Sequence, residues 1–251
     1  MYFFSEFRNL IRGLLSGIVV LLALASFFFA FGPQEVSFFG STFTAPLLSA
    51  ERSFAVLVFE RMWNDLVPSG MTMVVMNPLD AFMAQVKISL LFGFFAALPI
   101  LLYGVLSYLF PALYIHERRA TLRVLFPAAL LFAGGCLFAY TIVIPATFTL
   151  LYPYAESIGA LPFFAVGDFI ALSLGIMFVV GCMFLLPVCM FLLNRLGMAS
   201  AEFWRHNWGY ALVTFLVLSA IITPDGSGIS MILLALPLAV LYGVGVVVSR
   251  K

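Results

Sequence analysis

Apolar residues are gathered along this chain in long stretches, and short segments rich in proline, glycine or charge separate them. Apolar runs of about eighteen residues or more recur, which is the pattern of helices that cross a lipid bilayer. We predict six such spans, at residues 14–31, 81–109, 122–151, 169–193, 208–223 and 229–248. We therefore expect an all-α membrane protein with six transmembrane helices, organised as a single integral membrane domain over residues 1–251.

The last two spans differ from the others in length and in the way they are joined. The fifth span, residues 208–223, would form roughly 24 Å of helix against a hydrocarbon core of about 30 Å. Only Pro224-Asp225-Gly226-Ser227-Gly228 separates it from the sixth. Because Pro-Asp-Gly favours a tight turn, we expect two short helices in a hairpin, with Asp225 as a turn residue.

The segment between the first two spans, residues 32–80, is long enough to hold structure of its own. Within it, residues 50–66 have an apolar middle, from Phe54 to Phe59, and charged residues at both ends. This pattern predicts a helix that lies on the helix bundle or in the membrane interface. We therefore expect a structured first loop on the extracytoplasmic side.

Lysine and arginine are distributed unevenly between the predicted inner and outer segments. With six spans and both ends inside, the inner side holds Arg8, Arg12, Arg118, Arg119, Arg123, Arg195, Arg205, Arg250 and Lys251. The outer side holds only Arg52, Arg61 and Lys87. Cytoplasmic segments of membrane proteins carry an excess of basic residues, so we expect both termini in the cytoplasm.

Composition and the placement of ionisable residues exclude several classes of function. The chain is 64% hydrophobic and 9% charged, which is more apolar surface than a water-soluble domain of this size can bury. Its three cysteines show no metal-ligand spacing, so we expect no metal or cofactor. No nucleophile and base occur together within a span, which argues against an enzyme. The alternative is a small-molecule secondary transporter, but such proteins usually carry ionisable residues near the bilayer midplane, whereas Lys87 lies near a span end.

The segment LFPALYIHERRA, residues 109–120, places a carboxylate inside a basic cluster on the inner side. Topology explains Arg118 and Arg119, but it does not explain Glu117, because an acid adds nothing to orientation. A carboxylate flanked by arginines stays ionised and can accept a bidentate guanidinium from a partner. Glu6 is a second isolated inner carboxylate, and its simpler role is a favourable acid in the first turn of an N-terminal helix.

Three long segments occur in order along the chain: NPLDAFMAQVKISLLFGFFAALPILLYGVLSYLFPALYIHERR, FAYTIVIPATF and ITPDGSGISMILLALPLAVLY. Together they resemble the TatC family, the multispanning receptor subunit of the twin-arginine protein translocase. The resemblance extends from about residue 40 to the C-terminus and includes Ala45-Pro46-Leu47 in the first loop. The ordered combination of LYxHERR, FAYxxxxP and TPD is specific, whereas each motif alone is weak.

The resemblance implies a Sec-independent protein translocase subunit that binds the twin-arginine signal peptide of folded cargo at the cytoplasmic face. It also implies an oligomeric complex with single-span subunits of the TatA and TatB types, in a prokaryotic-type cell membrane and without a nucleic-acid partner. The family's N-terminal glutamate and the glutamate of its HERR loop correspond to Glu6 and Glu117. The neighbouring candidates for signal-peptide binding are Arg8, His116, Arg118 and Arg119.

The chain departs from the family pattern inside two spans. Many members have a glutamate two residues before the proline of the fourth span, where this chain has Leu185. Many have another after the tyrosine of the last span, where this chain has Gly243. We therefore expect partner docking there to depend on apolar packing. The candidate partner or structural positions are Pro46, Asp225 and Leu185.

Two further predictions concern the ends of the spans. The sequence Gly167-Asp168-Phe169 predicts Asp168 as the N-cap of the fourth span. Trp204 and Trp208 precede and begin the fifth span, and they fit an aromatic anchor at the inner membrane interface.

Overall fold

The computed structural model is mainly helical, with short strands in the regions that join the helices. It describes residues 2–38, 41–48, 52–67, 72–109, 118–157, 159, 163–195, 197–223 and 228–249. The chain divides into two compact units. The first comprises Met1–Val105 and Pro162–Leu174, and the second comprises Leu106–Leu161 and Gly175–Lys251.

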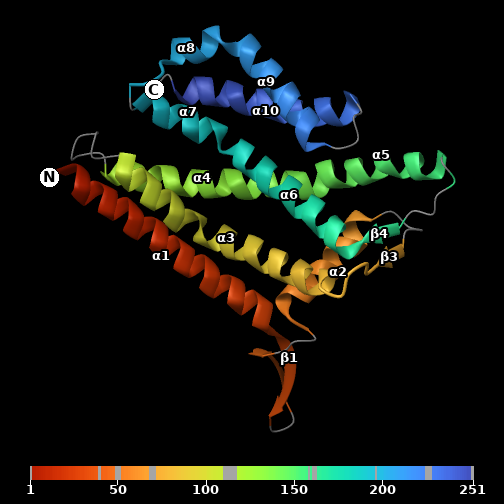
Figure 1. Ribbon diagram of the computed structural model, residues 1–251. Helices are drawn as coiled ribbons and strands as arrows, with labels where there is room; N and C mark the ends of the chain where they lie inside the picture. The colour runs from red at the N-terminus through yellow and green to blue at the C-terminus, as the bar shows by residue number, and fades with distance from the viewer. Residues whose placement is uncertain are drawn as a thin grey trace. The chain divides into compact units, whose positions relative to one another are not determined.

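Two long apolar helices form most of the first unit (Figure 1). They are α1 (Tyr2–Ala30) and α3 (Asp80–Leu109), and α3 contains Pro99 without ending there. The predicted spans 14–31 and 81–109 lie in these helices. Because α1 begins well before the first apolar run, the charged N-terminal segment is continuous with the span rather than a separate element.

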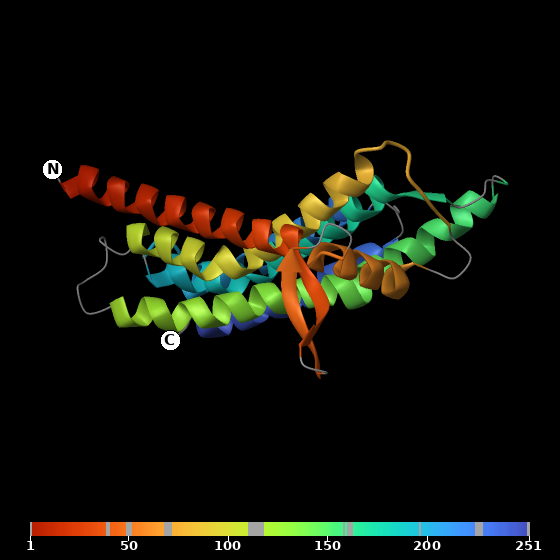
Figure 2. The ribbon, with the colours of Figure 1, turned by 90° about the horizontal axis from the view of Figure 1, so that it is seen from below.

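A β-hairpin follows α1, and the sequence analysis does not predict it. β1 (Phe31–Phe38) pairs antiparallel with β2 (Ser41–Leu48). The hairpin projects away from the end of α1 in two perpendicular views (Figures 1 and 2). Gly32 permits this path, because a Cβ atom at that position would collide with the backbone carbonyl of Arg52.

The remainder of the first loop holds the helix that the sequence predicts. α2 (Phe54–Leu66) begins after Ser53, whose side chain accepts a hydrogen bond of 3.4 Å from the N–H of Val56. The predicted start is wrong by four residues, because the capping serine fixes where the helix begins. Beyond α2, the short strands β3 (Thr72–Val74) and β4 (Phe163–Ala165) pair in parallel.

The second unit begins with three consecutive helical segments that contain the predicted third span. They are α4 (Arg118–Phe138), the π-helical turn η3 (Ala139–Val143) and α5 (Ile144–Ser157). Pro145 follows the wide turn by two residues and has no N–H to donate to the preceding turn. Wide turns of this kind accommodate such an interruption without ending the helix.

The predicted fourth span is divided into α6 (Val166–Phe184) and α7 (Leu186–Arg195). Asp168 lies in the first turn of α6, so the prediction that it is the N-cap is wrong. The helix starts at Val166, three residues earlier than predicted, because β4 leads directly into it. In the first turn, the Asp168 carboxylate still faces the positive end of the helix dipole.

Three helices complete the second unit: the short α8 (Ala201–His206), α9 (Trp208–Ile222) and α10 (Gly228–Val248). α9 and α10 pack against each other, as the predicted hairpin requires, and both are blue in Figure 1. Asp225 lies in the connection between them and outside the described residues.

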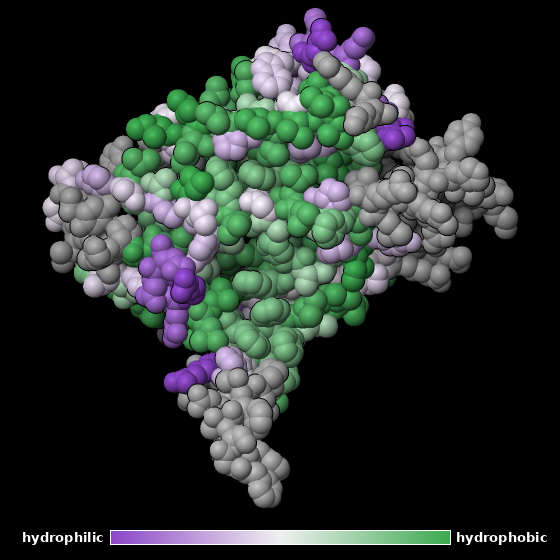
Figure 3. Space-filling model, turned by 180° about the vertical axis from the view of Figure 1, so that it is seen from behind, coloured by the Kyte–Doolittle hydropathy of each residue, from purple (hydrophilic) through white to green (hydrophobic). Residues whose placement is uncertain are grey.

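Among the described residues, five helical segments are long and apolar enough to cross a membrane: Gly13–Ala30, Asp80–Tyr103, Leu125–Leu151, Val166–Arg195 and Gly228–Val248. The 15-residue α9 is apolar but shorter than these. Apolar side chains cover most of the helical surface visible in Figure 3, as a lipid-facing surface requires. The chain is a multi-pass membrane protein.

Candidate functional site

The predicted signal-peptide residues are distributed over two helices of different units. Glu6 and Arg8 lie on α1, while Arg118 and Arg119 begin α4. His116 and Glu117 lie outside the described residues. The pairing of Glu6 with Glu117 therefore stays a prediction.

The helix that carries Glu6 is held against α3 by two glycines. At Gly17, a Cβ atom would collide with the Leu101 side chain. At Gly93, a Cβ atom would lie 2.6 Å from the carbonyl oxygen of Leu21 and 3.0 Å from the backbone nitrogen of Ala25. Such close approach of two helix backbones is typical of membrane proteins. Helices in lipid have no hydrophobic driving force to associate, so they depend on the close van der Waals packing that small residues permit.

Aromatic rings continue this contact toward the end of α1 that carries the hairpin. Phe28 stacks on Phe92 of α3 at 5.2 Å between ring centroids. Phe29 meets Phe82 edge to face at 5.6 Å. The contacts show that α1 and α3 run antiparallel, since higher numbers on one helix meet lower numbers on the other.

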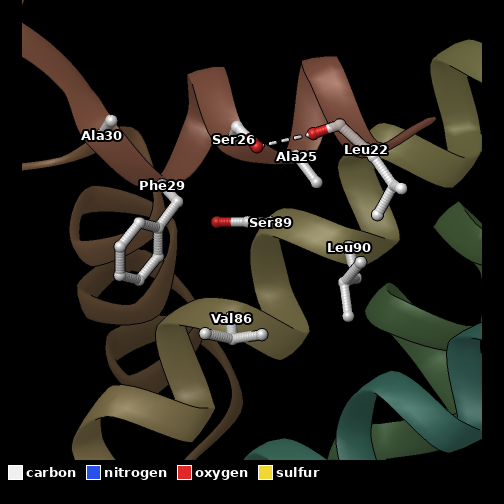
Figure 4. Close-up of a pocket in the computed structure, with 8 residues that line it drawn as sticks. All are labelled: Leu22, Ala25, Ser26, Phe29, Ala30, Val86, Ser89 and Leu90. Carbon is white, nitrogen blue, oxygen red and sulfur yellow. Dashed lines mark hydrogen bonds between the residues drawn. The ribbon is translucent and has the colours of Figure 1, made fainter. Parts of the chain in front are cut away.

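Between these contacts an open groove separates part of α1 from α3, with a volume of about 340 Å³ (Figure 4). Its lining is almost entirely apolar and consists of Leu22, Ala25, Ser26, Phe29, Ala30, Val86, Ser89 and Leu90. Figure 4 shows the hydroxyl of Ser89 pointing from α3 into the space between the two helices.

The Ser89 hydroxyl differs from most other hydroxyls on the described apolar helices. Serine and threonine side chains there donate to the carbonyl oxygen four residues earlier, as Ser26 does to Leu22 at 2.7 Å and Ser219 to Phe215 at 2.7 Å. Ser89 is 2% exposed, and its Oγ has no hydrogen-bond partner in the described part of the chain. A buried hydroxyl without a partner is costly in an apolar surrounding, and Ser173 shares this arrangement.

Sequence reasoning missed the groove. Ser89 and Ser26 each appear as one polar residue inside an apolar run, and only the register of two helices brings them together. The available signal was the pair of glycines, Gly17 and Gly93, which mark close backbone approach on each helix.

Leu185, a candidate partner or structural position, lies at the break between α6 and α7. Its N–H donates to the Cys182 carbonyl at 3.1 Å, and its own carbonyl accepts from Val188 and Cys189 at 2.9 and 3.0 Å. Pro187 has no N–H, so the α-helical ladder cannot continue through this point. The half-buried Leu185 therefore occupies a helix junction.

Pro46, the other described candidate of this kind, lies in β2 and pairs in register with Pro33 of β1. Proline cannot donate to a ladder, so this paired position contributes no N–H from either strand.

One end of the second unit is held together by Tyr242 of α10. Its hydroxyl donates to the carbonyl oxygen of Trp204 at 2.6 Å, and its ring lies 5.2 Å from that of Trp208. Nearby on the same helix, a Cβ atom at Gly243 would come within 3.6 Å of Trp208. The two tryptophans that the sequence marks as an anchor are therefore packed against the last helix, although Trp208 stays 39% exposed.

Comparison with known proteins identifies the family. The family model described as "Sec-independent protein translocase protein (TatC)" matches residues 4–237. The Sec-independent protein translocase protein TatC of Cenarchaeum symbiosum is 34% identical over 251 residues, which are 100% of this chain and 95% of that protein. The chain belongs to the TatC family.

Other TatC proteins agree with this result. The TatC of Escherichia coli K12 is 32% identical over 184 residues, covering 73% of this chain and 70% of that one. A crystal structure of the twin-arginine translocase receptor TatC matches with a TM-score of 0.76 and 27% identity, over 98% of this chain and 100% of that one.

The comparisons confirm the resemblance that the sequence motifs indicate. As a TatC protein the chain is a protein translocase component and not an enzyme. The same result decides against the alternative function of a small-molecule secondary transporter.

Proposed function

We propose that this TatC protein is the receptor of its translocase, and that it binds the twin-arginine signal peptide of folded cargo at the cytoplasmic face. It then forms an oligomeric complex with TatA-type and TatB-type single-span subunits. The whole chain forms one integral domain of a prokaryotic-type cell membrane, with six spans and both termini in the cytoplasm. Family membership supports the receptor role, and the distribution of basic residues supports the orientation.

The observation that best supports the site is the antiparallel register of α1 and α3. Gly17 meets Leu101, and Ala25 meets Gly93. Because the two helices run antiparallel, the N-terminal part of α1, which carries Glu6, and the C-terminal part of α3 within the first unit lie on the same side of that unit. In the sequence Glu117 follows α3 by eight residues, and on this basis the two acids are proposed to share one membrane face.

The chemistry of the site follows from the shape of the ligand. Each guanidinium of a twin-arginine motif presents a planar fork of donors that fits a carboxylate, and two arginines require two such acceptors. Glu6 and Glu117 supply them, while Arg118 and Arg119 keep Glu117 ionised. Arg8 and His116 lie beside the two acids in the sequence and complete the proposed site.

A binding titration tests the proposal with labelled signal peptide and the purified protein in nanodiscs. Glu117→Gln keeps the shape but loses the charge. A charge-assisted pair contributes roughly 1.5–3 kcal/mol, so affinity should fall on the order of tenfold. Glu6→Gln should weaken binding similarly, and a signal with lysines in place of arginines should bind the wild type more weakly.

Glu202→Gln is the matched control, because Glu202 is the third acid on the predicted inner side and is exposed on α8. It should leave affinity for the signal peptide unchanged. Wild-type affinity in the Glu6→Gln, Glu117→Gln double variant would contradict the proposed site.

A further inference from the structure

Lys87 is an exposed cation within the apolar helix α3, about two turns from the start of that helix at Asp80. In the described part of the chain, no carboxylate pairs with it. Arg61, another cation of the predicted outer side, pairs with Asp65 at 2.9 Å. A charge within an apolar segment is costly unless its long stem carries it to water or to an anion. Lys87 therefore requires such surroundings from outside its own chain.

The register of α1 and α3 gives the depth of Lys87 in the membrane. Gly93 of α3 lies against Leu21 and Ala25 of α1. Lys87 is six residues nearer the start of α3, roughly 9 Å along the helix axis, which brings it level with the last turn of α1. The apolar run of α1 ends there, at Ala30. Lys87 is thus at the edge of the hydrocarbon core, next to the layer that holds the lipid headgroups.

The groove between α1 and α3 begins at the same level and extends toward the middle of the membrane. Its lining runs from Ala30 to Leu22 on α1, which is roughly 12 Å by the helical rise. That length is close to half of the hydrocarbon thickness of about 30 Å, the depth of one leaflet. Lys87 precedes the lining residue Leu90 by three positions, so the two are neighbours on one side of α3.

The walls of the groove offer a ligand apolar contacts and no free polar group. Figure 4 shows the side chains of Leu22, Val86 and Leu90 around the space. The Ser26 hydroxyl donates to the Leu22 carbonyl oxygen at 2.7 Å, and the Ser89 Oγ is closed off from the surface. An acyl chain has no polar group below its ester, so it fits these walls without leaving a polar atom unpaired.

We propose that a phospholipid with an anionic headgroup binds here, with its phosphate beside the Lys87 ammonium and part of one acyl chain in the groove. The ammonium attracts the phosphate as a point charge, and a headgroup with a net negative charge leaves that attraction uncompensated. The inference goes beyond the proposed receptor function and does not depend on it. Only the assignment of the lipid to the outer leaflet rests on the proposed orientation.

Two observations favour lipid over a helix of another protein. The groove reaches the depth of one leaflet, whereas a spanning helix needs contact along the whole hydrocarbon thickness. In addition, the apolar part of α1 is only 11% buried, and its exposed residues cover a broad face. They are Leu15, Ser16, Ile18, Val19, Leu22, Ala23, Ser26 and Phe27. Acyl chains cover a broad face, whereas a single helix packs along a narrow line of side chains.

Native mass spectrometry tests the role of the charge. The full chain is released from nanodiscs that contain phosphatidylglycerol and phosphatidylcholine in equal amounts, and the wild type should retain phosphatidylglycerol. Lys87→Gln should lower this retention about fivefold, which corresponds to about 1 kcal/mol for one lysine near anionic lipid. Lys87→Arg keeps the charge and should retain the lipid. Arg61→Gln is the matched control, because Arg61 is an outer cation that already has an acidic partner, and it should change nothing.

A photoreactive lipid tests the role of the groove. Phosphatidylglycerol with a diazirine in the middle of one acyl chain should give adducts concentrated on residues 22–30 and 86–90, as mapped by peptide mass spectrometry. Ala30→Leu narrows the groove and should lower the yield of these adducts. Ala23→Leu is the matched control, because it adds the same volume at an exposed position of α1 that does not line the groove. It should leave the yield unchanged.

Several results would overturn the inference. One is equal retention of phosphatidylglycerol by the wild type, Lys87→Gln and Arg61→Gln. Another is a set of adducts spread evenly over the exposed surfaces of α1 and α10. A third is the loss of a co-purified protein, rather than of lipid, from Lys87→Gln, since Lys87 would then pair with an acidic side chain of that protein. If Lys87→Gln does not fold, the comparison of Ala30→Leu with Ala23→Leu decides, and equal yields would contradict the lipid.

Discussion

The hydroxyl of Tyr242 and the backbone carbonyl of Trp204 are joined by a hydrogen bond of 2.6 Å, which connects the last helix to the short α8. The Tyr242 side chain is 4% exposed, and its ring lies edge-on to those of Trp204 and Trp208. The contact fixes the connection between α7 and α9 against α10, at a point where the backbone would otherwise form a free loop.

Tyr242→Phe tests the contribution of this bond to stability. The ring and its packing stay, but the Trp204 carbonyl loses its donor, so the free energy of unfolding should fall by about 1 kcal/mol. Equilibrium unfolding in mixed micelles measures the change. Tyr210→Phe is the control, because Tyr210 is 77% exposed, and it should have no measurable effect. Equal effects of the two substitutions would contradict a specific role for the bond.

Close packing of α1 on α3 predicts opposite effects of one substitution at two glycines. Gly93→Ala places a Cβ atom 2.6 Å from the Leu21 carbonyl oxygen, so unfolding should become easier by about 1–3 kcal/mol. Gly134→Ala meets nothing within 4 Å and should stabilise its helix by roughly 0.5–1 kcal/mol. Thermal unfolding in one detergent compares them, and a shift of the same sign in both would count against the packing.

The predicted orientation is tested by labelling single cysteines in a variant whose three native cysteines are serine. Cysteines at Ser41 and Ser157 should react with a membrane-impermeant maleimide added outside intact cells. Ser41 follows the first predicted span and Ser157 follows the third, so the predicted topology puts both positions on the outer side. A cysteine at Ala120 should react only after the cells are opened. Reaction of Ala120 from outside would overturn the predicted topology.

Leu185→Glu tests whether the helix junction takes part in partner docking. It introduces the residue that many family members have there, and a polar group inside the bilayer gains most when a neighbouring helix provides a partner. The amount of co-purified single-span subunit should therefore rise, and Leu185→Gln should show a smaller rise. If neither substitution changes co-purification, the junction at Leu185 has only a structural role.

The helices could be predicted from the sequence because long apolar runs have one stable arrangement in a bilayer. The residues at which the helices begin and end were harder to predict. The β-hairpin begins at Phe31, inside what the hydropathy pattern presents as the end of a span, so its strands were not distinguished from loop. The start of α2 depended on the Ser53 cap, and the start of α6 depended on the pairing of β4, which hydropathy does not show.

The candidate sites also differ in how far the sequence could predict them. Glu6 and Glu117 could be named as predictions, because the ordered motifs of the TatC family can be matched to this chain position by position. The groove could not, because it depends on which turn of α1 meets which turn of α3. That register follows from glycines at positions 17 and 93, whose effect appears only when two backbones are placed side by side.

The wide turn at Ala139–Val143 determines which face of its long helix stays inside the second unit. Buried or half-buried residues recur there at every fourth position: Ala128, Phe132, Cys136, Tyr140, Ile144 and Phe148. At 100° per residue, a line with period four rotates by about 40° at each step, so over five steps a regular α-helix would carry it about 200° around the axis. The extra residue accommodated in the π turn takes back part of that rotation. A deletion of one residue between Ala139 and Val143 would therefore turn the half of the helix beyond it toward the lipid, without removing a single apolar side chain.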